Sequence, residues 1–129
     1  MPTAVDLQNR TKAFALRVFK VFRALPESRE GRVLGHQLLR SASSVAANYR
    51  AACRARSHRD FIFKLGIVEE EADETLFWLE FISDTGLIPR TKLEDLISEA
   101  GQITAIMVAS RRTAKNKSRK SEIDNRKLS

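Results

Sequence analysis

The sequence predicts an all-α protein, namely an up-down-up-down antiparallel four-helix bundle followed by a disordered basic C-terminal tail. Four long segments carry apolar residues at three- and four-residue steps, which is the repeat of one helix face. The 129 residues include only three Pro and five Gly, so few positions interrupt these segments. The connections between the segments are short, and short connections favour antiparallel neighbours. The length suits one domain, which we place at residues 1–110, with the tail at 111–129.

The first two segments predict long amphipathic helices. The first helix is expected from about Asp6, as N-cap, to Leu25, and Pro26 stops it. The second helix is expected from about residue 30 to residue 56. Small side chains at positions 41–44, 46 and 47 of this second helix would allow close packing of a neighbouring helix.

The third helix opens at Ser57, where the stretch to Asp60 resembles a capping box, and it ends near Gly86. The fourth helix is expected after Pro89, where Thr91 to Glu94 reads as a full capping box. We expect this helix to fray between residues 111 and 114, because the sequence beyond is polar and basic.

Charge is distributed unevenly along the chain. Residues 1–64 carry a net +9, residues 65–110 a net −8 and residues 111–129 a net +6, which together give +7. A basic half and an acidic half in one folded unit suggest an anionic partner, self-complementary assembly, or both.

Two groups of cations are candidate phosphate contacts. The first group lies on the second helix, away from its apolar stripe, and continues into the third: Arg40, Arg50, Arg54, Arg56 and Arg59. The second group lies in the tail and includes Arg111, Arg112, Lys115, Lys117, Arg119 and Lys120. Such side chains bind phosphate through charge and hydrogen bonds, which carries no base-sequence information. The alternative is that the first group pairs with the acidic half and the tail only aids solubility.

The third helix has more apolar surface than a monomeric bundle needs. Phe63, Phe77 and Phe81 point opposite its core stripe, and a set of seven residues forms this outer face: Phe63, Ile67, Glu70, Glu74, Phe77, Trp78 and Phe81. A patch of this kind is typical of a protein interface, so we predict a homo-oligomer. The alternative is an irregular bundle that covers these side chains itself.

No catalytic, metal or cofactor site is predicted. His36 and His58 lack zinc spacing, and neither follows a Glu by three residues as di-iron bundles require. The single cysteine, Cys53, has no local nucleophile signature. No run of 18 apolar residues and no signal pattern is present, so we expect a protein of the cytoplasm without membrane contact.

Several separated motifs resemble one family of proteins. They are LLRSASSVAANYR at 38–50, RSHRDFIFKL at 56–65, EADET at 71–75, Trp78-Leu79, and the pairs at 6–7 and 10–11. Over roughly residues 6–110 the chain resembles the bacterial four-helix bundle proteins related to those encoded in 23S ribosomal RNA intervening sequences. Two positions depart from the usual pattern. Ala51 stands where an acidic residue is frequent, and Glu70 stands where Lys is common.

The resemblance implies a ring-like homopentamer and a kinship with the accessory protein of diversity-generating retroelements. That accessory protein binds a reverse transcriptase and nucleic acid. The matched positions look structural and transfer no catalytic residue: Ser41, Ser44, Asn48, Ser57, Asp60, Phe61 and Trp78. We therefore expect a non-enzymatic homo-oligomer that binds RNA or DNA nonspecifically. The competing interpretation is a protein–protein scaffold without a nucleic-acid partner.

Overall fold

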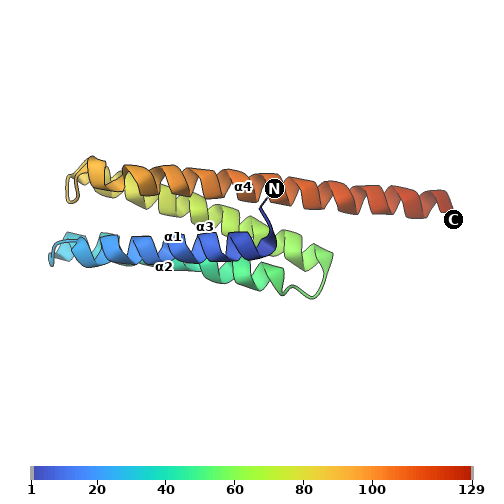
Figure 1. The fold of residues 1–129 in the computed structure, drawn as a ribbon, viewed down its shortest axis with the longest axis horizontal. Coiled ribbons are helices and arrows are strands. Elements are labelled where there is room, and N and C mark those ends of the chain that lie inside the picture. Colours follow the sequence, from blue (N-terminus) through green and yellow to red (C-terminus); the bar gives the residue numbers. More distant parts are fainter. Residues whose placement is uncertain (1, 129) are drawn as a thin grey trace.

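The computed structural model describes residues 2–128, which form four α-helices and no strand. They are α1 (Ala4–Ala24), α2 (Arg29–Cys53), α3 (His58–Thr85) and α4 (Arg90–Leu128). Each helix packs against the next one along the chain, and α1 also touches α4 (Figure 1). The predicted four-helix bundle is therefore confirmed. No helix within residues 2–128 has an apolar stretch long enough to cross a membrane.

The start of α1 differs from the prediction. Thr3, and not Asp6, is the N-cap: its hydroxyl accepts a hydrogen bond from the Asp6 backbone N–H at 3.1 Å. The Asp6 carboxylate in turn accepts from the Thr3 N–H at 2.9 Å, which completes a capping box. The backbone N–H of Thr3 and, to a smaller extent, its side chain favour the charged carboxylate and lower the pKa of Asp6.

The ends of α2 and α3 depend on residues with distinct capping chemistry. Ser28 caps the start of α2, and that helix ends at Cys53, three residues before the expected end. The Ser57 hydroxyl accepts from the Asp60 N–H at 3.0 Å, as its place before α3 predicted. Gly86 ends α3 with φ at 78°, a backbone region that favours glycine.

The predicted capping box at the start of α4 is wrong. The helix already begins at Arg90, so Thr91 lies inside its first turn and cannot be the N-cap. The Lys92 N–H instead donates to the carbonyl of Pro89 at 3.0 Å. Proline before a helix has a fixed φ, and its carbonyl remains free to accept the first helical bond.

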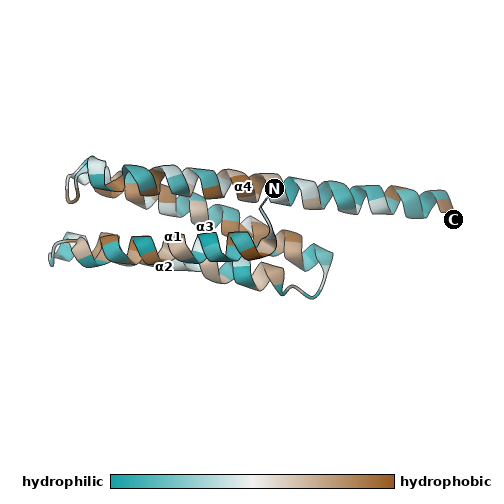
Figure 2. Ribbon diagram, in the orientation of Figure 1, coloured by the Kyte–Doolittle hydropathy of each residue, from teal (hydrophilic) through white to brown (hydrophobic). Residues whose placement is uncertain are grey.

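The predicted disordered tail also differs from the structure. Residues 111–128, which we call the α4 extension, continue the helix, and their later part projects beyond the other three helices (Figure 1). Hydrophilic side chains dominate this segment (Figure 2). It contains neither Pro nor Gly, and adding residues to an existing helix is much easier than nucleating one. The polar composition that predicted disorder is therefore compatible with a solvated helix.

The core is formed by the inner stripes of all four helices. Its fully buried side chains include Phe14, Leu38, Leu65, Leu79 and Ile103. One polar contact lies within it, where the Thr75 hydroxyl of α3 is 3.0 Å from the Ser41 hydroxyl of α2. The Ser41 hydroxyl donates to the Leu38 carbonyl at 3.1 Å. Both buried hydroxyls are therefore satisfied, which avoids the cost of an unpaired polar group.

The seam between the first and last helices depends on an ion pair. The Arg10 guanidinium donates through Nε and Nη2 to the two oxygens of Glu99, at 2.9 and 2.6 Å. These bonds raise the pKa of Arg10. The paired geometry fixes the direction of both side chains, which a single contact would not do.

A pair of glycine substitutions tests the packing of α2. A Cβ at Gly31 would lie 2.2 Å from the Pro26 carbonyl oxygen, whereas a Cβ at Gly101 would meet nothing within 4 Å. We expect Gly31→Ala to lower the free energy of unfolding by about 1–3 kcal/mol. Gly101→Ala, the matched control, should raise it by about 0.5–1 kcal/mol. Urea unfolding measures both, and equal effects would contradict the close approach at Gly31.

Candidate nucleic-acid and oligomer interfaces

A basic groove runs between α1 and α2. Lys12 of α1 lies there with Arg50 of α2 and with Arg54, which caps that helix. The groove encloses about 500 Å³, and its other lining residues are polar or small: Gln8, Asn9, Ala15, Ser43, Ala46 and Ala47. No carboxylate is among these lining residues, so the three cations face a neutral surface. This arrangement favours an anion over a cationic or apolar ligand.

Arg40 was grouped with Arg50 and Arg54, but the structure places its charge elsewhere. Its guanidinium pairs with Glu74 of α3 and lies 3.4 Å from the Glu71 carboxylate. It also donates to the Gln37 side chain at 3.2 Å. The alternative interpretation, pairing with the acidic half, therefore describes Arg40. Arg40 helps to join α2 to α3, with the modest energy of a half-exposed ion pair.

The remaining cations of the first group lie at the turn from α2 to α3. Arg56 is exposed and borders a hollow beside Tyr49 and Cys53. Arg59 is exposed in the first turn of α3. Tyr49 itself is buried, and burial raises the pKa of its hydroxyl. Among these residues, Arg54, Arg56 and Arg59 follow one another closely around a single end of the bundle.

The α4 extension brings further cations to that same end. Arg111 donates to the Glu69 carboxylate of α3 at 2.8 Å, and the exposed cations follow it along the helix: Arg112, Lys115, Lys117, Arg119 and Lys120. Arg112, Lys115 and Arg119 are spaced by three and four residues, so they share one helix face. A helical extension thus presents a row of positive charge that a disordered tail would not fix in space.

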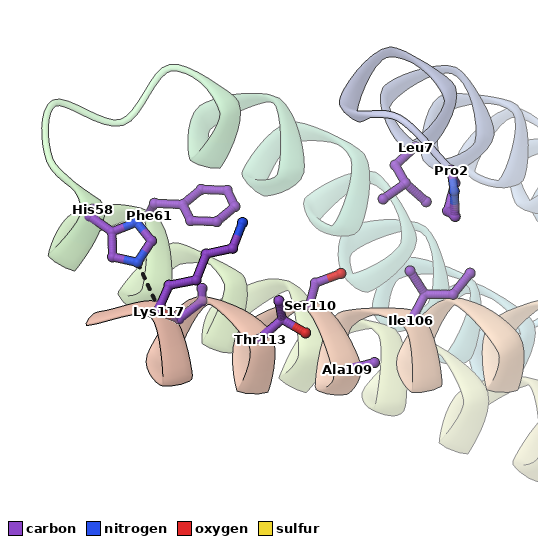
Figure 3. A pocket seen from close by; sticks show the side chains of 10 residues that line it. Pro2, Leu7, His58, Phe61, Ile106, Ala109, Ser110, Thr113 and Lys117 are labelled. Atoms are coloured by element: carbon purple, nitrogen blue, oxygen red, sulfur yellow. Dashed lines mark hydrogen bonds between the residues drawn. The ribbon is translucent and has the colours of Figure 1, made fainter. Parts of the chain in front are cut away.

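Contacts with α3 hold the beginning of the α4 extension. Ala114 is buried, and its carbonyl lies 2.8 Å from the His58 ring Nε2 (Figure 3). The side chains of His58, Phe61 and Lys117 border one end of an apolar hollow of about 300 Å³. Leu7 and Pro2 lie at its other end, where α1 begins. His58 therefore has a structural contact across the two helices.

The outer face of α3 is exposed, as its sequence pattern indicated. The exposed fractions of Phe63, Phe77 and Phe81 are 67%, 54% and 42%. Trp78 is half-buried and its Nε1 donates to Glu74 at 3.0 Å, while its ring lies 4.9 Å from that of Phe77. Ile67 is half-buried and Glu70 is exposed. The bundle leaves this face largely uncovered. An irregular bundle that covers its own outer side chains, the alternative considered for this face, therefore does not describe the three phenylalanines.

Sequence reasoning missed a second exposed apolar surface, on α1. Val5, Leu16 and Phe19 have exposed fractions of 64%, 56% and 41%. They lie opposite the buried stripe that includes Phe14 and Val18, and helical spacing alone could have identified them. Among residues 2–128, no three His, Cys, Asp or Glu side chains gather in a way that could hold a metal ion.

Similarity to known proteins identifies the family. The 23S rRNA-intervening sequence protein model matches residues 4–109. The chain belongs to this family. It is similar to a crystal structure of a protein with unknown function from the S23 ribosomal protein family of Bacteroides thetaiotaomicron. The two are 32% identical, with a TM-score of 0.76, over 81% of this chain and 97% of that one. No curated protein matches.

The match to the 23S rRNA-intervening sequence protein family covers α1, α2, α3 and the first half of α4. The matched region stops at residue 109, just before the α4 extension. The basic row that includes Arg112, Lys115 and Arg119 therefore lies outside the family match. The groove between α1 and α2 and the outer face of α3 lie within it.

A substitution at Ala114 tests whether α3 holds the α4 extension. Ala114→Asp would bury a carboxylate against α3, so we expect amide exchange at residues 111–117 to quicken by at least tenfold. The neighbouring Thr113 is exposed, and Thr113→Asp is the matched control that should leave exchange nearly unchanged. Hydrogen exchange followed by mass spectrometry measures both. Equal exchange in the two variants would mean that the extension does not depend on this contact.

Proposed function

We propose that this protein is a non-enzymatic, cytoplasmic homo-oligomer that binds RNA or DNA through phosphate contacts without reading base sequence. The observation that carries the proposal is the groove in which Lys12, Arg50 and Arg54 converge without a carboxylate among its lining residues. Guanidinium groups bind phosphate through charge-assisted hydrogen bonds, and such contacts supply most nonspecific affinity for nucleic acid.

The placement of the other cations supports the same proposal. Two of them, Arg56 and Arg59, lie at the end of the bundle where the chain turns from α2 into α3. The row of exposed cations on the α4 extension lies at the same end. A strand that follows the groove toward this end would meet positive charge along its path.

The assembly we propose is a pentameric ring, and its number of subunits comes from the family resemblance. The exposed phenylalanines on the outer face of α3 support an interface between copies, because monomeric proteins seldom leave aromatic clusters of this kind uncovered. Kinship with retroelement accessory proteins extends the proposal to a protein partner such as a reverse transcriptase.

A second candidate function is a protein–protein scaffold that binds no nucleic acid. The ion pairs of Arg40 with Glu74 and of Arg111 with Glu69 favour it, because they show cations engaged with the acidic half of the same chain. The groove between α1 and α2 distinguishes the candidates, since its three cations have no such partner within it.

Salt-dependent binding tests the nucleic-acid function. We expect Arg50→Glu combined with Arg54→Glu to weaken binding of a generic RNA or duplex DNA by at least tenfold at low salt. The log–log salt slope should become shallower by roughly 2, because each phosphate contact contributes about 0.9. Fluorescence anisotropy at several salt concentrations gives both quantities.

The matched control for this experiment reverses the same charge at the other end of α2. Arg29→Glu combined with Arg32→Glu changes the net charge equally but lies outside the groove. This control should retain most of the affinity. Equal losses would indicate a general charge effect, and a wild-type protein that binds neither nucleic acid would favour the scaffold.

Light scattering tests the assembly. We expect the wild-type mass to be close to five times the 14.6 kDa of one chain. Phe63→Asp should lower that mass, because it places a charge in the centre of an apolar contact without affecting the core. A wild-type monomer would contradict the assembly, and an unaltered mass for the variant would remove Phe63 from the interface.

A further inference from the structure

One patch on α1 is built like an interface although nothing in the chain covers it. Leu16, Phe19, Lys20 and Arg23 are all exposed, and their spacing of three, four and seven residues places them on one helix face. We call these four residues the α1 patch. The Arg23 guanidinium lies 6.0 Å from the centre of the Phe19 ring, so charge and aromatic surface are combined in one place.

The outer face of α3 has the opposite charge. It joins the exposed rings of Phe77 and Phe81 to two exposed carboxylates, Glu70 before them and Asp84 one turn beyond Phe81. No Lys or Arg of α3 belongs to this face, although Arg40 of α2 pairs with its Glu74, and no Asp or Glu belongs to the α1 patch. Each surface is apolar at its centre, so the two differ mainly in the sign of their charges.

We propose that the α1 patch of one copy docks on the outer face of α3 of a second copy. This inference rests on the proposed function for the existence of the oligomer, and it adds the surface that meets α3. Charge decides between the possible pairings. If two α3 faces met, Glu70 and Asp84 of one copy would face the same carboxylates of the other. If two α1 patches met, Lys20 and Arg23 of both copies would repel each other. The mixed pairing joins opposite charges.

The arrangement of the bundle prevents the two surfaces from meeting within one chain. Each helix packs on its neighbours in sequence, and the backbones of α1 and α3 do not approach each other closely across the bundle. Every copy therefore offers one surface of each kind, which makes the contact heterologous. Such contacts satisfy all copies only when they close into a ring, and otherwise they continue as a fibre.

The α1 patch borders the basic groove. It begins at Leu16, one turn after Lys12 on the same face of α1, and the groove extends from there along the first half of the helix. Arg50 and Arg54 lie at the end of α2, beside the beginning of α1. Assembly and phosphate binding would therefore use neighbouring parts of one helix.

Two single variants and their mixture test the pairing. Phe19→Asp disables the α1 patch and Phe77→Asp disables the α3 face. Alone, each variant should fail to assemble, and light scattering should no longer show the mass of the oligomer. Mixed in equal amounts, they should form a heterodimer and nothing larger, because one intact α3 face and one intact α1 patch remain. Val33→Asp, an exposed apolar position of α2 outside both surfaces, is the control that should assemble normally.

The outcomes separate this inference from the function on which it rests. If Phe77→Asp is monomeric while Phe19→Asp assembles like the wild type, the α3 face is an interface but the α1 patch is not its partner. A wild-type monomer would defeat both proposals. Circular dichroism confirms that each variant folds.

If a phenylalanine variant does not fold, charge reversal gives a second test. Lys20→Glu with Arg23→Glu should weaken assembly by at least tenfold, and adding Glu70→Lys and Asp84→Lys to the same chain should restore it. Failure of this restoration would overturn the pairing.

Discussion

Close approach of α2 to both of its neighbours is the constraint on which the rest of the structure depends. At Gly35 a Cβ would lie 3.0 Å from side-chain atoms of Phe22 and Leu25, so these residues pack directly against the α2 backbone. On the other side, the 3.0 Å contact between the Ser41 and Thr75 hydroxyls requires α2 and α3 to be close enough for two short side chains to meet. Small residues thus fix α2 between two helices. Its outward arginines are held in place as a consequence.

The looser seam between α1 and α4 follows from the same arrangement. These helices are joined by the paired bonds between Arg10 and Glu99 and, beside the start of α1, leave an apolar hollow that His58 and Lys117 border. The burial that stabilises the bundle therefore comes chiefly from the contacts of α1 with α2, α2 with α3 and α3 with α4. At a partly exposed seam, an ion pair fixes the relative orientation of the two helices more than it adds to the free energy of unfolding.

Most of the fold could be predicted from the sequence, because the apolar spacing of all four helices matches their buried faces. The errors lie where local chemistry allows two solutions. Thr3 and Asp6 can each cap a helix, and only their reciprocal bonds decide for Thr3. The helical α4 extension depends on a helix that is already packed at Ala114, which composition does not reveal. For the site, spacing identified Arg50 and Arg54 but could not bring Lys12 to them, nor pair Arg40 with Glu74.

The separation of charge along the chain has one consequence for both proposals. A protein that paired all its cations with its own carboxylates would have little positive potential left. Among residues 2–128, the ion pairs between helices include those of Arg10, Arg40 and Arg111. Lys20 and Arg23 of α1 and the three cations of the groove are exposed, where a partner can reach them. Assembly by charge complementarity would neutralise the second half of α1 and leave the grooves positive. A ring would then repeat one modest phosphate site around its circumference, and repetition raises the avidity for a long polyanion without any new contact.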